Sequence, residues 1–152
     1  MNATTHAAGT CDTDALNSLL RGELSAVETY DQAMTKFDGQ PTQTDLRRIR
    51  EQHAAAAATL RQKVTHFGGK PSESSGAWGA FATAVTGAAK VFGPATALSA
   101  LKQGEEHGIG EYEDALTNEQ IDPGCKDVIR SQLLPECRRH VDTLDRLIGG
   151  MK

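Results

Sequence analysis

Apolar side chains recur every three or four residues along four long stretches of the chain, the spacing of helices that bury one face. The first stretch begins near Asp12–Asp14, where an aspartate can cap it, and ends before residues 38–41 (DGQP). The second follows at once. Thr42 with Asp45 resembles a capping box, and the apolar stripe runs to the stop at Gly68-Gly69. These signals predict two consecutive helices joined by a short turn.

The second half of the chain repeats this layout. A third helix is predicted after Gly93-Pro94, and a fourth is introduced by Asp122-Pro123, a cap followed by a proline in the first turn. Pro135 lies inside the fourth stretch and should kink it. Between the halves, residues 76–93 carry an amphipathic pattern with one Trp and two Phe. We interpret this segment as a crossover with a short extra helix. The alternative is a subunit interface anchored by those aromatic side chains.

Two short connections and one long one favour antiparallel neighbours with a crossover between pairs. The sequence therefore predicts an all-α fold, an antiparallel four-helix bundle over residues 12–149, preceded by a flexible N-terminus at residues 1–11. The length of 152 residues suits one domain with a real core.

Composition narrows the functional classes. The net charge of −4 is mild, and the densest basic patches, residues 47–50 and 138–139, spread around their helices, so we expect no nucleic-acid partner. Three cysteines are too few for a disulfide scaffold and favour a reducing compartment. The first residues lack a signal-peptide pattern, and residues 76–93 are short for a membrane span. We therefore expect a cytoplasmic protein without a membrane partner.

Each predicted helix carries one polar residue in the middle of its apolar stripe. These residues are Glu23, His53, Glu105 and His140. A buried carboxylate without a partner costs several kcal/mol, so it needs a cation, a proton or a metal. The two halves also resemble each other as an internal repeat. Residues 22–33 align with residues 104–115, which places Glu23 on Glu105, and the second helix aligns with the fourth, which places His53 on His140.

Two-fold pseudosymmetry would bring these four residues to one level of the bundle. Carboxylates and imidazoles in a dry core suit iron, manganese or zinc, and iron or zinc is the favoured prediction. The alternative is a metal-free structural or interaction module, in which Arg50 neutralises the two glutamates and the histidines are satisfied by them. We also expect a homo-oligomer, a dimer or larger.

Several motifs resemble a known superfamily. The stretch LLRGELSAVETY looks like the first helix of bacterioferritins and related ferritin-like proteins, rubrerythrins among them, and His53 and His140 resemble the ends of its two Glu-x-x-His motifs. The pattern GELSAVETY, GEEHG, YEDAL and LLPECRRH is similar to a bacterial ferritin-like family of unassigned function. The resemblance covers residues 12 to 149. It implies that Glu23 is a metal ligand and that any chemistry is iron or peroxide handling.

The sequence departs from the superfamily at two positions. A di-iron centre needs a glutamate three residues before each histidine, but Arg50 and Cys137 occupy those positions. Glu51 is two residues before His53 and points elsewhere. Glu136 is four residues before His140, and the kink at Pro135 would have to turn it inward. We therefore do not expect a full ferroxidase centre, and we leave Glu136 and the Cys137 thiolate as less certain ligands.

Overall fold

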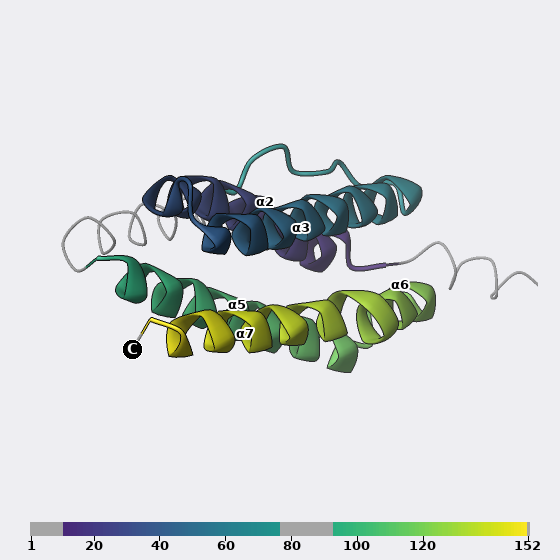
Figure 1. Ribbon diagram of the computed structural model, residues 1–152. Helices are drawn as coiled ribbons and strands as arrows, with labels where there is room; N and C mark the ends of the chain where they lie inside the picture. Colours follow the sequence, from purple (N-terminus) through teal and green to yellow (C-terminus); the bar gives the residue numbers. More distant parts are fainter. Residues whose placement is uncertain (1–10, 77–92, 152) are drawn as a thin grey trace, which may run out of the picture.

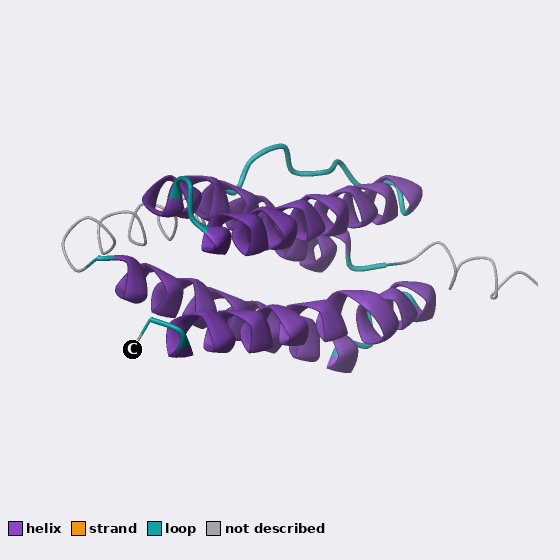
Figure 2. Ribbon diagram, in the orientation of Figure 1, coloured by secondary structure: helices purple, strands orange, loops and turns teal. Residues whose placement is uncertain are grey.

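The computed structural model describes residues 11–76 and 93–151, and within them the chain is helical and has no strand (Figure 2). The long helices are α2 (Thr13–Met34), α3 (Pro41–His66) and α5 (Pro94–Thr117), followed by α6 (Pro123–Val128), η3 (Ile129–Leu133) and α7 (Leu134–Gly149), which continue one another. The predicted all-α fold is confirmed. None of the helices in these residues is long and apolar enough to cross a membrane.

The helices form two layers of two (Figure 1). Helices α2 and α3 lie side by side in one layer, and α5 and α7 lie side by side in the other. A single 3₁₀ turn, η1 (Thr35–Phe37), leads from α2 toward α3, so these neighbours run antiparallel. The short extra helix and the aromatic stripe predicted for the crossover lie in residues 77–92, outside the described residues.

Two of the predicted helix starts are capped as expected. The Asp12 carboxylate accepts a hydrogen bond from the Ala15 backbone N–H at 2.8 Å, and Asp122 accepts from Gly124 at 2.8 Å. The capping box predicted at Thr42 is wrong, because α3 begins at Pro41, one residue earlier, without a side-chain cap. Proline suits this position, where the missing N–H would have no helical partner.

The predicted irregularity at Pro135 is a widened turn directly before it. The Leu134 N–H donates to the Ile129 carbonyl, five residues back, which makes η3 a turn of π-helix. A proline cannot donate to the fourth carbonyl before it, and its ring clashes with that carbonyl in a regular helix. The π-turn relieves this conflict and rotates the chain, so that the consecutive Leu133 and Leu134 are both buried.

The core consists of two apolar clusters, one toward each end of the bundle. One contains Leu16, Leu20, Leu60, Val64, Ile121, Cys125 and Ile129 among others. The other contains Phe37, Leu46, Ile49, Leu98, Leu101 and Leu144 among others. Along each long helix, the buried polar residue falls between the members of the two clusters. The bundle therefore encloses a polar layer between two apolar ones.

Candidate metal centre

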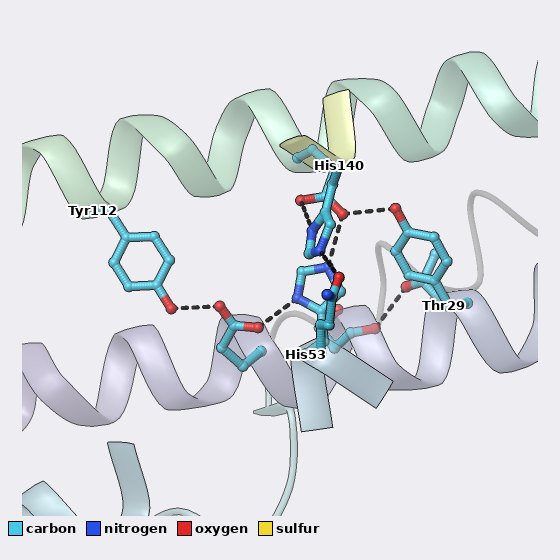
Figure 3. A network of polar contacts seen from close by, with 9 residues as sticks. Thr29, His53, Tyr112 and His140 are labelled. Atoms are coloured by element: carbon cyan, nitrogen blue, oxygen red, sulfur yellow. Dashed lines mark hydrogen bonds and ion pairs between the residues drawn. The ribbon is translucent and has the colours of Figure 1, made fainter. Parts of the chain in front are cut away.

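The four polar residues predicted from the apolar stripes come together in this middle layer. Glu23 comes from α2, His53 from α3, Glu105 from α5 and His140 from α7, and each is between 3% and 6% exposed. The rings of His53 and His140 face each other from opposite layers, with centroids 4.8 Å apart (Figure 3). The sequence thus located four buried groups that lie far apart along the chain.

His53 is held between the two glutamates. Its Nδ1 lies 2.5 Å from Glu23 Oε2, and its Nε2 lies 2.7 Å from Glu105 Oε1. Burial alone would lower the pKa of His53, but the charges of Glu105 and Glu23 outweigh burial and raise this pKa well above its ordinary value. Because both ring nitrogens face carboxylate oxygens, the metal-free His53 is an imidazolium that donates one N–H to each glutamate.

Glu105 is the most connected residue of the centre. Its Oε1 is shared by His53 and the Tyr30 hydroxyl, which donates at 2.6 Å, and its Oε2 lies 3.3 Å from His140 Nδ1. Burial raises the pKa of this carboxyl, but the His53 charge and the close contacts with both histidines bring it well below its usual range. Glu105 therefore stays ionised in the core, with a positive partner beside it.

The two tyrosines bind the carboxylates reciprocally. Tyr30 on α2 donates to Glu105 on α5, and Tyr112 on α5 donates to Glu23 on α2 (Figure 3). Burial and the neighbouring carboxylates raise the pKa of both phenols well above the ordinary value, so both keep their protons at neutral pH. Each tyrosine thus links the two layers through a carboxylate of the opposite layer.

Sequence reasoning missed one member of the network. Gln52, on α3, receives a hydrogen bond on its Oε1 from His140 Nε2 at 2.8 Å. Because the amide oxygen is an acceptor, this contact places the proton on Nε2 and leaves Nδ1 facing Glu105. The only available signal was that Gln52 directly precedes His53 in the sequence. On a helix, adjacent side chains point about 100° apart, and here that direction is toward α7.

The structure corrects the role assigned to Arg50. Its guanidinium Nε lies 2.9 Å from Asp31 Oδ1 at the partly exposed edge between α3 and α2, and it does not reach between Glu23 and Glu105. The centre needs no arginine, because His53 supplies the positive charge. The metal-free alternative therefore no longer depends on Arg50, and its cation would be His53 inside the network.

Of the two less certain ligands, Glu136 stays outside the centre. Its side chain is 27% exposed and lies 4.0 Å from Arg139, so the π-turn does not rotate it inward. Cys137 does face the centre. It is buried, and burial together with the charges of Glu23 and Glu105 raises the pKa of its thiol far above the ordinary value. Among the described residues, the group of donor atoms that converge comprises His53, Glu105 and His140 and leaves Cys137 out. Glu51 is exposed.

A cavity of about 70 Å³ adjoins the centre between α2 and α5. Glu23, His53, Glu105, both tyrosines and Cys137 line it together with the small residues Gly22, Ala26, Gly104 and Gly108 and the exposed His107. Such a volume holds several water molecules, since one needs roughly 10–15 Å³. The buried centre is thus accessible to small molecules from the α2–α5 side.

Three of the four residues are suited to hold one metal ion. One donor atom from each of His53, Glu105 and His140 falls within 4.8 Å of the others. The contacts of Glu105 with His53 Nε2 at 2.7 Å and with His140 Nδ1 at 3.3 Å lie near the about 3–3.5 Å that separates neighbouring ligands of a small divalent ion. Each histidine also has a hydrogen-bond partner on its other ring nitrogen, Glu23 and Gln52, as metal-ligating histidines usually have.

Fold and site together define an α-helical bundle with a buried centre of two histidines and two glutamates. A family model described as a domain of unknown function (DUF2383) matches residues 12–118, more than two thirds of the chain, and the chain belongs to this family. The match includes Glu23, His53 and Glu105 and ends before α6, so His140 lies beyond it. No curated protein and no solved structure matches the chain.

Proposed function

We propose that the protein binds one divalent transition metal ion through His53 Nε2, Glu105 and His140 Nδ1. The donor set carries this proposal, since two imidazoles and a carboxylate in a closed core form the combination that suits zinc, iron and manganese. In this proposal Glu23 does not bind the ion itself but contacts its ligand His53. It accepts the Nδ1–H of His53 and fixes the ring with Nε2 toward the ion.

The charge of the centre supports the binding of a single ion. In the metal-free centre Glu23 and Glu105 share the His53 imidazolium, and metal binding displaces the His53 Nε2 proton, because the ligating form of histidine is neutral. Two carboxylates then cancel one divalent ion. A second ion would bring two more charges, and neither Arg50 nor Cys137 offers the carboxylate that a close pair of ions requires.

The resemblance to ferritin-like proteins extends the proposal to iron or oxidative-stress handling. Three protein ligands leave at least one position of the ion free, and two of them, His53 and Glu105, line the cavity between α2 and α5. When bound, the metal would supply a Lewis-acidic or redox-active centre there. The protein supplies two protonated phenols and a cavity for small molecules beside the centre.

Calorimetric titration with Zn²⁺ and anaerobic Fe²⁺, together with metal analysis of the purified protein, tests the proposal. We expect one ion per wild-type chain, loss of that ion in His140→Gln, and unchanged binding in His66→Ala, a matched change at an exposed histidine. Wild-type protein that binds no ion stoichiometrically, or a His140→Gln variant that binds as well as wild type, would contradict it.

A second candidate function is favoured by the His53 imidazolium. His53 lies between the two carboxylates, and no buried side-chain nitrogen or oxygen among the described residues lacks a partner. A metal-free structural or interaction bundle is consistent with this. The same titration decides between the two, because that bundle would bind no ion under any loading condition.

A further inference from the structure

Two of the three cysteines lie next to each other at the end of the bundle remote from Phe37. Cys11 precedes α2, and Cys125 lies in the first turn of α6, so they are far apart in the sequence. Cys125 is buried in the apolar cluster at this end, Cys11 packs against that cluster, and the two thiols are within hydrogen-bonding reach. Both are free thiols.

Several hydrogen bonds hold the two segments in this register. The Asp12 N–H donates to the Gln120 carbonyl at 2.7 Å, and the Asn118 amide donates to the Asp12 carboxylate at 3.2 Å. Asp122 connects both cysteines directly. Its backbone N–H donates to Cys11 Sγ at 3.4 Å, and its carboxylate accepts from the Cys125 N–H at 3.3 Å. The turn that contains Asp122 therefore positions both thiols.

The two thiols differ in reactivity. Cys11 is partly exposed, and the Asp122 backbone N–H donates to its sulfur. Cys125 is buried, and burial and the neighbouring Cys11 raise the pKa of its thiol to about 11. Cys11 is thus the thiol that an oxidant in solution meets first, and Cys125 is the one placed to react with the product.

We propose that Cys11 and Cys125 form a reversible intramolecular disulfide on exposure to hydrogen peroxide. The Cys11 thiolate attacks one peroxide oxygen, the O–O bond breaks, and the released hydroxide takes a proton to give water and a sulfenic acid. The Cys125 sulfur then attacks the sulfenic sulfur. The S–O bond breaks, the hydroxyl leaves with the Cys125 proton as a second water, and the S–S bond forms. Two thiols are oxidised and one peroxide is reduced.

The disulfide would join the segment before α2 to α6 and so tie the two helix pairs together at this end. In Figure 1 that segment and α6 lie at the same end of the bundle. A cross-link between residues far apart in the sequence restricts the unfolded chain strongly. The proposal does not depend on metal binding, since none of the groups that position the pair belongs to the His/Glu centre.

Intact and peptide mass spectrometry of the full chain tests the proposal. Reduced protein is treated with a small excess of hydrogen peroxide in the presence of a chelator, unfolded and alkylated. We expect the loss of two hydrogen atoms, a Cys11–Cys125 cross-linked peptide and alkylation of Cys137 alone, which serves as a buried control thiol in the same molecule. The midpoint of thermal unfolding should rise on oxidation and return after reduction with dithiothreitol.

Two variants separate the steps. Cys11→Ser should show neither the mass change nor the thermal shift. Cys125→Ala, which keeps a small apolar side chain in the cluster, should stop at a Cys11 sulfenic acid that dimedone labels. Complete alkylation of all three cysteines after peroxide treatment, or disulfides that join only different chains, would overturn the proposal.

Discussion

At the residue scale, each buried carboxylate of the centre is bonded by a histidine and by a tyrosine from the other helix pair. Glu23 accepts from His53 and Tyr112, and Glu105 accepts from His53 and Tyr30. A buried ionised group keeps its charge only when its lone pairs are satisfied. The hydroxyls of both tyrosines are therefore part of the stability of the centre, and they also line its cavity.

Tyr112→Phe removes the hydroxyl that Glu23 accepts from and leaves a buried carboxylate oxygen short of a donor. The expected loss in the free energy of unfolding is about 1–3 kcal/mol, measured by chemical denaturation. Thr29→Val is the matched control. It also deletes a buried hydroxyl, but that hydroxyl donates only to the Ser25 carbonyl of its own helix. Equal losses in the two variants would mean that the Tyr112–Glu23 hydrogen bond contributes no more to stability than the Thr29 hydrogen bond within α2.

The pH dependence of the metal-free protein follows from His53 and Glu105. The pKa of His53 is raised on folding, so its contribution is complete below about 6.5 and is lost as the pH rises toward the folded value. The pKa of Glu105 is lowered, so its contribution is complete above about 4.3 and is lost at lower pH. Stability should be greatest between these values.

Thermal unfolding of chelator-treated protein, measured from below about pH 4.3 to above about pH 6.5, checks the expectation. His53→Gln should abolish the decline on the alkaline side, and His66→Ala should leave it in place. With Zn²⁺ present the sign reverses, because the metal competes with the His53 proton and the stabilisation by zinc grows with pH. A zinc effect that is independent of pH would show that His53 does not give up a proton on binding.

At the scale of the helices, local signals at their ends explain much of the layout. Asp12 and Asp122 cap α2 and α6, and prolines begin α3 and α5. Apart from the start of α3, which was expected at Thr42, these features were predictable because they depend on neighbours in the sequence. The apolar stripe of α2, in which the three-to-four spacing places Val27, was predicted less well. Val27 is only partly buried whereas Thr29 is buried, because the neighbouring helices, which periodicity alone does not reveal, decide how wide the covered face is.

Asp122→Ala removes the carboxylate that accepts from the Gly124 and Cys125 backbone N–H groups. We expect a loss of about 1 kcal/mol in the free energy of unfolding, the usual value of an aspartate cap. Asp127→Ala is the control, since that carboxylate is 77% exposed and pairs only with Arg130, three residues on. It should change stability by less than about 0.5 kcal/mol. The prediction fails if the two variants unfold at the same denaturant concentration.

At the scale of the whole molecule, the centre is a polar layer clamped between two apolar clusters. The sequence was sufficient to predict the helical bundle and the meeting of Glu23, His53, Glu105 and His140. It did not reveal which group neutralises the carboxylates. Arg50, three residues before His53 on the helix, is turned about 60° away from it, and Asp31 is within reach there. Whether Arg50 or His53 neutralises the carboxylates depends on the orientation of α3 about its own axis relative to α2.

X-ray absorption at the metal edge of protein loaded with one equivalent of zinc tests the central claim most directly. The account predicts two imidazole nitrogens at about 2.0–2.1 Å, further oxygen ligands and no sulfur, because Cys137 is not among the donors that converge in the described residues. His140→Gln should lose one imidazole. A spectrum with sulfur scattering, with fewer than two imidazoles in the wild-type protein, or with the signature of hydrated zinc alone would contradict the account.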